Sequence, residues 1–348
     1  MSNPNFDTLV ATTLKNYRAN LADNITAHQA VWEQLKQRGF IREDEGGTSI
    51  VEPLLVGRNT TVKSFAGYDI IDTTPQVGIT AAEFNWKQVA GSVTISGEEE
   101  FKNGGSKTKV ISLLQSKITQ LELSMMLEIN RQLQADGTGN GGKDITGLAL
   151  AIEDGAVWSV YGGIDSNAFP YWRNQWIDMA AFLGGAGTLD LGAGIAASLR
   201  QLIRAMTTMY NSCMRGKVRP TVIITDQMMY EAYEQSMQMT SANYRIMIDQ
   251  KLADAGIMNL LFKETPVVFD EDMPGASLVT NSDGHQMIFG NADFMKFVVG
   301  RGKNFVVSDF VRPENQEAKV SHVILYGNLT ICNRARQGRI SNINTQNT

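Results

Sequence analysis

One stretch of the sequence has the residue types of a phosphate-binding loop. Residues 137–143 read G-T-G-N-G-G-K and match G-x-x-x-x-G-K, a pattern whose backbone amides cradle phosphates. Three features disagree: Asp144 stands where a magnesium-ligating Ser or Thr belongs, a helical pattern precedes the run, and none follows it. We therefore expect a glycine-rich turn, with a nucleotide-binding enzyme as an alternative.

Other reactive side chains show no spacing that builds a site. The histidines at 28, 285 and 322 lie far apart, and Cys213 and Cys332 have no metal or redox spacing. The acidic runs 98–100 and 270–272 are typical of solvated turns. The sequence thus predicts no catalytic, cofactor-binding or metal site, no cofactor, and a protein that is not an enzyme.

Composition restricts the class of protein. The 348 residues are 43% hydrophobic and 19% charged, which predicts a globular chain of about two domains. No apolar run is long enough to span a membrane, and the N-terminus lacks the pattern of a secretory signal, so no membrane partner is expected. The net charge is −5, whereas proteins that bind nucleic acid through its phosphates usually carry an excess of basic residues.

The N-terminal third combines helix and strand patterns. A loose apolar stripe predicts a helix over 6–38, and the glycine pair Gly46–Gly47 is a candidate hinge. Alternation over 48–96 predicts β-structure. The apolar phase flips between Trp86 and Val89, which predicts a bend there.

The pattern of residues 57–87 predicts a projecting hairpin. They contain little apolar material for a core of their own, and an isolated two-stranded ribbon is marginal in water. We expect the ribbon to lie on another domain or another copy of the chain, and deletion of 60–84 to leave a folded monomer that cannot assemble.

The remaining pattern predicts a long helix and then an α/β region. An apolar seam with spacings of three and four predicts a helix over 107–135. A shorter helix is expected around 171–183, and another over 195–211. Asp226 is expected to cap a helix that runs to Met239. Strands are expected at 220–224, 267–269, 287–289, 294–299, 305–311 and 320–331.

This order of elements, with several local strings, resembles the major capsid protein of tailed double-stranded DNA bacteriophages, the Hong Kong 97-type fold. The strings that carry the resemblance are GGTSIVEPL at 46–54, YDIID at 68–72, FNWKQ at 84–88, ISGEE at 95–99, DGTG at 136–139 before Gly147–Leu148, and GNL at 327–329. The similarity covers nearly the whole chain.

The resemblance implies an α+β fold with an N-arm, an extended β-hairpin loop, a long spine helix, a peripheral domain and an axial α/β domain. By element, residues 1–47 match the mostly helical N-arm. Residues 48–149 and 306–348 match the peripheral domain, with the extended loop at about 55–90 and the spine at 107–135, and 150–305 match the axial domain.

The implied function is self-assembly into an icosahedral shell around the phage genome. The implied partners are further copies, in hexamers and pentamers, with a separate scaffolding protein because residues 1–45 are too few for a fused scaffold. A portal protein and a decoration protein would complete the virion capsid, assembled in the bacterial cytoplasm, and double-stranded DNA would be enclosed without sequence-specific binding.

The expected inter-subunit contacts lie in or beside the extended loop, and Gly46 and Gly47 are expected to act as hinges. Some relatives crosslink a loop lysine to a neighbour's asparagine, and Lys63 lies in the matching loop, which makes crosslinking a hypothesis. Residues expected to contact a neighbour are Arg58, Lys63, Tyr68, Asp69, Asp72, Glu83 and Trp86.

Three alternatives stay open from the sequence. An encapsulin would build the same kind of shell around cargo enzymes. An enzyme would use the glycine run at 137–143. A tail or baseplate protein would form tubes or open rings.

Overall fold

We describe the fold from a computed structural model of the chain. The structure describes residues 40–98, 113–156, 158–183, 188–190, 195–240, 260–273, 284–309, 311–314 and 316–346. The predicted helix over 6–38 and residues 107–112 of the predicted long helix lie outside these ranges. The described elements mix helices with two larger sheets, as the predicted α+β class requires. None of the described helices combines the length and apolar character needed to cross a bilayer.

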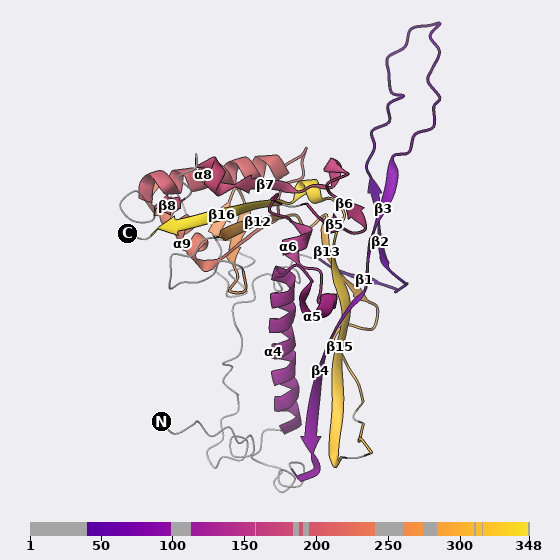
Figure 1. The fold of residues 1–348 in the computed structure, drawn as a ribbon, viewed down its shortest axis with the longest axis vertical. Helices are drawn as coiled ribbons and strands as arrows, with labels where there is room; N and C mark the ends of the chain where they lie inside the picture. The colour runs from indigo at the N-terminus through magenta and orange to yellow at the C-terminus, as the bar shows by residue number, and fades with distance from the viewer. Residues whose placement is uncertain are drawn as a thin grey trace.

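The predicted long helix forms the upright part of the molecule. Helix α4 (Leu113–Gln134) lies beside strands β4 (Lys87–Ser96) and β15 (Ala318–Ile331), which pair antiparallel along the full length of β4 (Figure 1). A Cβ atom at Gly91 would lie 2.4 Å from the Leu121 side chain, so glycine lets the helix approach the strand. Met125 and Ile129 on the predicted apolar seam are buried.

Strands from distant parts of the chain complete a five-stranded sheet beside α4. β1 (Ile41–Asp44) pairs in parallel with β13 (Met295–Gly300), which pairs with β15. β14 (Val306–Val307) pairs with β15 at two positions, and Val311 adds one isolated bridge, so the strand predicted over 305–311 is much shorter than expected.

A second sheet of seven strands forms the α/β part. Its path runs β10 (Leu260–Phe262), β11 (Thr265–Phe269), β9 (Val222–Thr225), β12 (His285–Gly290), β16 (Gly338–Gln346) and β7 (Gln175–Asp178), and β8 (Thr188–Asp190) pairs with β16. Helices α8 (Ile195–Cys213) and α9 (Gln227–Thr240) pack on it, and α8 lies across the top of the body, below the tip of the segment between β2 and β3 (Figure 1).

Both faces of this second sheet are buried. In β9, Ile223 packs in the core under α8 and α9, while Val222 and Ile224 pack in the core shared with α4. The same alternation separates Met287 from Ile288 in β12. Strands covered on both faces lack an apolar-polar alternation, which explains the continuous apolar runs in the sequence.

Sheet membership cuts across the predicted domain division, which stays a prediction. Residues 338–346 were grouped with the long helix, but β16 is a strand of the seven-stranded sheet. Conversely, the prediction assigns β13 to the axial domain and β1 to the N-arm. In the structure both strands belong to the five-stranded sheet beside α4.

The helix predicted around 171–183 is also wrong over most of its length. The chain instead forms a 3₁₀ turn (Pro170–Trp172), then β7, then the single turn α7 (Met179–Phe182). The Asp178 carboxylate accepts a hydrogen bond from the Ala180 amide at 3.1 Å and caps α7. Alanine and methionine at 179–181 favour helix, but pairing of β7 with β16 fixes the preceding residues as strand.

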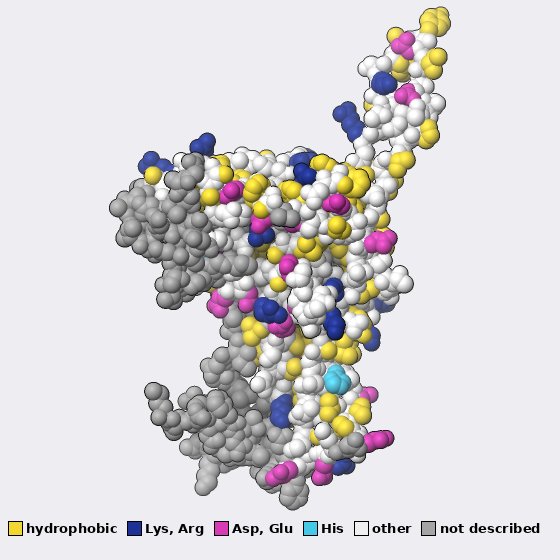
Figure 2. All heavy atoms as spheres, viewed as in Figure 1, with side chains coloured by type: hydrophobic (Ala, Val, Ile, Leu, Met, Phe, Trp, Pro, Cys, Tyr) yellow, Lys and Arg dark blue, Asp and Glu magenta, His cyan; other side chains and the backbone are white. Residues whose placement is uncertain are grey.

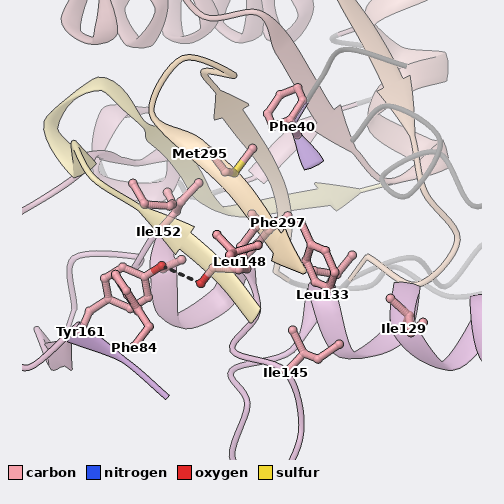
Figure 3. Close-up of a cluster of buried hydrophobic side chains, with 14 of the residues drawn as sticks. Phe40, Phe84, Ile129, Leu133, Ile145, Leu148, Ile152, Tyr161, Met295 and Phe297 are labelled. Atoms are coloured by element: carbon pink, nitrogen blue, oxygen red, sulfur yellow. Dashed lines mark hydrogen bonds between the residues drawn. The ribbon is translucent and has the colours of Figure 1, made fainter. Parts of the chain in front are cut away.

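Residues far apart in the sequence meet in one apolar core around the upper end of α4. Figure 3 shows Leu133 of α4 and Leu148 of the short helix α6 (Leu148–Ala151) close to Phe297 of β13. Phe84 packs edge-on against Tyr161 of β5 (Val160–Tyr161), with ring centroids 5.0 Å apart. β5 pairs with β6 (Ile164–Asp165) to form a small hairpin over this core.

One buried arginine ties several of these segments together. Arg334 is fully buried and its Nη2 lies 2.9 Å from the Glu153 carboxylate. Its Nε donates to the Ala151 carbonyl at 2.8 Å, and its Nη1 donates to the Ser166 hydroxyl at 2.6 Å. The guanidinium also lies over the Tyr161 ring, 5.1 Å from its centroid.

Candidate functional site

The most prominent surface feature is a loop that projects beyond the rest of the molecule. β2 (Ile50–Leu55) and β3 (Ile79–Phe84) pair antiparallel over six positions, and residues 56–78 continue outward as the projecting loop (Figures 1 and 2). The predicted hairpin was expected to be paired over 57–87. Its ladder instead lies at 50–55 and 79–84, and 56–78 form no strand.

Two glycines close the projecting loop at its base. The Val56 and Gly57 amides donate to the Gly78 carbonyl at 2.8 and 3.2 Å. A Cβ atom at Gly57 would lie 3.0 Å from the Gly78 Cα, so the backbones of the two arms lie in direct contact here, with no room for a side chain between them. The loop is therefore a nearly closed insertion on the β2–β3 ladder.

Polar side chains of the projecting loop largely bond to the loop itself. The Lys63 ammonium lies 3.5 Å from the Asp72 carboxylate across the two arms. Asp72 also accepts hydrogen bonds from the Thr74 hydroxyl and amide, and these bonds, more than Lys63, hold the pKa of its carboxyl below the ordinary value. Asp69 accepts from the Ala66 amide at 2.9 Å.

Apolar side chains of the loop and its base, by contrast, point into solvent. Tyr68, Ile70 and Val77 are almost completely exposed, and Phe65 is 65% exposed. Several large apolar side chains exposed on one loop favour an interaction site over a solvated turn. The full apolar loop surface consists of Leu55, Val62, Phe65, Tyr68, Ile70, Ile71, Val77 and Ile79.

The predicted contact residues therefore fall into two groups. Five of them lie in the projecting loop, whereas Glu83 and Trp86 lie at its base. Trp86 is half-buried and packs against the core, and the Glu83 amide donates to the Gly162 carbonyl at 3.0 Å. The five in the loop are Arg58, Lys63, Tyr68, Asp69 and Asp72.

Sequence reasoning missed most of the apolar loop surface. It named Tyr68 but treated the polar residues as the contact groups. The isoleucines at 70 and 71 and Val77 follow no strand or helix period, so they carry no secondary-structure signal. Their clue was the presence of large apolar residues in a segment with no opposing apolar face.

The predicted hinge lies between two strands. Gly46 and Gly47 connect β1 to β2 and have φ values of +103° and +134°, a region that other residues rarely adopt. Open space surrounds the position of a Cβ at Gly46. Backbone conformation, and not close packing, accounts for glycine here, and the hinge role stays a prediction.

The glycine run at 137–143 forms a structural turn. It follows α4, and its only helical segment, α5 (Gly139–Gly142), is one turn with left-handed residues inside it. The Asp136 carboxylate accepts from the Thr138 amide and hydroxyl, and the Lys87 ammonium donates to the Gly142 carbonyl. The run thus joins the end of α4 to α6 beside the base of the projecting loop.

The described residues contain no group of three histidine, cysteine or acidic side chains placed to hold a metal. Asp226 stands immediately before α9, where a cap is predicted, but its carboxylate lies 2.7 Å from Nδ1 of the buried His285 and does not cap the helix. The Asp226 carbonyl accepts from the Tyr230 amide, while its carboxylate contacts this histidine. Cys213 is buried, which raises the pKa of its thiol to about 12.

Comparisons with known proteins give matches at the level of structure. The sequence matches no protein-family model and no curated protein. The capsid asymmetric unit of cyanophage A-1(L) matches with a TM-score of 0.67 at 18% identity, over 95% of this chain and 97% of that chain. The mature capsid of bacteriophage PhiM1 matches with a TM-score of 0.59 at 8% identity, over 96% and 92%.

A cellular shell protein matches as well. The holo-SrpI encapsulin complex from Synechococcus elongatus PCC 7942 gives a TM-score of 0.55 at 9% identity, over 94% of this chain and 93% of that chain. These matches span nearly the whole of each chain, so they compare complete architectures. The chain therefore has the fold of tailed-phage major capsid proteins, which its sequence resemblance predicts.

Proposed function

We propose that this chain is the major capsid protein of a tailed double-stranded DNA bacteriophage and assembles into an icosahedral shell around the genome. The observation that carries the proposal is the match to the capsid of cyanophage A-1(L) over nearly the full length of both chains. The role is structural and not enzymatic, and it uses no cofactor.

The elements take the roles of a Hong Kong 97-type subunit. Helix α4 is the spine of a peripheral domain, the β2–β3 ladder with the projecting loop is the extended loop, and residues 1–47 supply the N-arm. The seven-stranded sheet with α8 and α9 is the axial domain, which now includes β16. In this arrangement the axial domains meet around five- and six-fold axes to form pentamers and hexamers.

Contact between subunits is supported most directly by the apolar loop surface. Burying one fully exposed large apolar side chain stabilises an interface by about 1.5–3 kcal/mol. An exposed ion pair contributes only about 0–1 kcal/mol. Since Asp69 and Asp72 already bond within the loop, we propose that apolar residues dominate the contact with the neighbouring copy.

The remaining partners follow from the same proposal. A scaffolding protein, a portal protein and a decoration protein would act with this chain during assembly in the host cytoplasm. The net charge of −5 agrees with enclosing DNA without sequence-specific binding. Tight, salt-sensitive duplex binding by the free subunit would contradict this point.

Crosslinking through Lys63 is a separate hypothesis. In the isolated subunit the Lys63 ammonium pairs with Asp72. A crosslink would require this lysine to leave Asp72 and reach a neighbour's asparagine. A denaturing gel of assembled particles that shows only monomer would exclude it.

An encapsulin is the second candidate, and the match to the SrpI complex favours it. An encapsulin shell would hold a cargo enzyme, whereas a capsid would hold DNA. The fold alone is common to both, so the contents of the particle separate the two functions.

Electron microscopy of the purified chain, alone and with its scaffold, tests the proposal. Uniform closed shells, or rings of five and six subunits, are the expected result, and nuclease-protected DNA should be found in particles from infected cells. Tubes or open rings would favour a tail or baseplate role instead. A persistent monomer in the presence of the scaffold would refute a shell function.

A further inference from the structure

The chain changes sheets at the base of the projecting loop. β3 ends at Phe84 and belongs to the two-stranded ladder, while β4 begins at Lys87 and belongs to the five-stranded sheet. Pairing of β4 with β15 begins at Lys87 opposite Gly327. The carbonyl of Asn85 therefore lies just outside the ladder and needs another partner.

A single buried side chain supplies that partner. Asn328, in β15, is 1% exposed, and its Nδ2 donates to the Asn85 carbonyl at 2.8 Å. Its Oδ1 accepts from the Thr146 amide at 3.0 Å and from the Leu329 amide at 2.9 Å. Its Nδ2 also lies 3.3 Å from the Thr146 hydroxyl.

These bonds join three parts of the molecule. Asn85 belongs to the joint between β3 and β4, and Thr146 follows the turn at the end of α4. β15 is the long strand that pairs with β4 on the side away from α4 (Figure 1). One amide group thus connects the loop base, the segment after α4 and the main sheet.

Asparagine is the side chain that these bonds require. It presents a donor and an acceptor without a charge. Aspartate would keep the acceptor, lose the donor to Asn85 and bury a charge. An alkyl side chain would remove the partner of the Asn85 carbonyl and of the Thr146 amide, two groups in a half-buried site.

We propose that Asn328 is a positioning residue that fixes the direction in which the projecting loop leaves the body of the subunit. The β2–β3 ladder shares no strand pairing with either larger sheet in the described part of the chain. The ladder packs into the shared core through Ile50, Leu54, Ala82 and Phe84, and the joint at Asn85 and Trp86 is its covalent connection to β4. Asn328 holds the backbone of that joint, while neighbouring contacts come from the Glu83 amide and the Lys87 ammonium.

The position of the loop can be measured on the unassembled full chain. Cysteines introduced at Ser64 in the projecting loop and at Ser124 on α4, both exposed positions, carry spin labels. Pulsed electron paramagnetic resonance then measures the distance between the loop and the body of the subunit. Cys213 and Cys332 are replaced by alanine so that only the two introduced cysteines carry labels. Asn328→Ala should broaden and shift the distance distribution.

Matched variants separate positioning from general stability. Ser321 lies on β15, the same strand as Asn328, and its buried hydroxyl donates to the Ser308 carbonyl at 2.7 Å. Ser321→Ala removes this hydroxyl and should leave the distance distribution unchanged. Asn85→Ala should also have no effect, because only the backbone of residue 85 takes part. A distribution like wild type in folded Asn328→Ala would overturn the proposal.

Asn328→Asp gives a test that does not depend on the alanine variant folding. A protonated aspartic acid has the shape of asparagine and again offers a donor to the Asn85 carbonyl. Burial raises the pKa of such a carboxyl, so protonation should be reached in mildly acidic buffer. We expect a narrow distribution at about pH 5 and a broad one at about pH 8, with wild type narrow at both. A distribution in this variant that does not change with pH would overturn the proposal.

The consequence for shells rests on the proposed function, but the distance measurement does not. If the loop is the assembly element, Asn328→Ala should also lower the yield of closed particles. A changed distance with a normal particle yield would support the positioning role and refute the use of the loop in assembly.

Discussion

The apolar loop surface predicts a large loss of assembly from a few substitutions. Phe65, Ile70 and Val77 are 65, 97 and 96% exposed in the isolated subunit. Replacing all three by serine removes apolar area that only a neighbouring subunit would bury. At the low end of about 1.5–3 kcal/mol for each buried side chain, the three together contribute roughly 4.5 kcal/mol. Because each 1.4 kcal/mol is about tenfold, the concentration needed for assembly should rise about a thousandfold.

The assay is light scattering or sedimentation of the assembly reaction across a series of subunit concentrations. Lys63→Gln is the matched control, since it removes the 3.5 Å pair with Asp72 and leaves the apolar residues in place. An exposed pair contributes about 0–1 kcal/mol, so the control should change the required concentration by less than about fivefold.

Thermal unfolding of the unassembled subunit distinguishes a lost contact from a damaged fold. The three side chains are exposed, so the triple variant should melt like wild type. Assembly of the triple variant at the wild-type concentration would refute an apolar contact. A larger defect in Lys63→Gln than in the triple variant would favour the polar contact that the sequence predicts.

Three further results are expected. Deletion of 58–77, which joins the glycines at the loop base, should give a stable monomer that forms no particles, whereas deletion of 60–84 also removes the buried Phe84 and should lower the melting temperature sharply. Arg334→Met removes the positive charge paired with the buried Glu153 carboxylate, which keeps only its hydrogen bonds from Ser159, and should cost about 3–5 kcal/mol in urea unfolding; a loss below about 1 kcal/mol would show that this network contributes little. Burial raises the pKa of Cys213 to about 12, so an alkylating reagent at neutral pH should modify it only after unfolding, and rapid labelling of the native chain would contradict its placement.

The elements with regular periodicity could be predicted from the sequence. The helix expected over 195–211 is observed as Ile195–Cys213, and the strand expected over 320–331 is observed as Ala318–Ile331. In both, apolar residues recur with the period of the element and face a core. The order of these elements, together with the local strings, was also enough to predict the capsid-protein fold that the structural matches show.

Strand β16 could not be predicted, and its backbone explains why. Ile340 and Ile343 are both buried although they lie three positions apart, which breaks the two-residue period of a strand. Asn342 between them has φ of +54°, and the pairing with β12 shifts register at this point. An irregularity of this kind hides a strand from pattern reading.

The loop base and the buried network were missed for another reason. Arg334 bonds to residues near 150–166, and Asn328 bonds to residues 85 and 146, so their partners are distant in sequence. Charged and amide side chains are expected on the surface unless such partners are known. Only the three-dimensional arrangement brings those partners together.

The antiparallel ladder between β4 and β15 has a mechanical consequence. A neighbour that pulls on the projecting loop transmits its force into the chain at Lys87, where β4 begins opposite Gly327. A force directed along β4 acts on the hydrogen bonds between β4 and β15 in shear. The bonds from Lys87 to Ser96 then share the force, so no single hydrogen bond carries all of it. We therefore expect the subunit to yield first at the joint around Asn85, with the ladder intact, when single molecules are stretched from the loop and from the far end of β15.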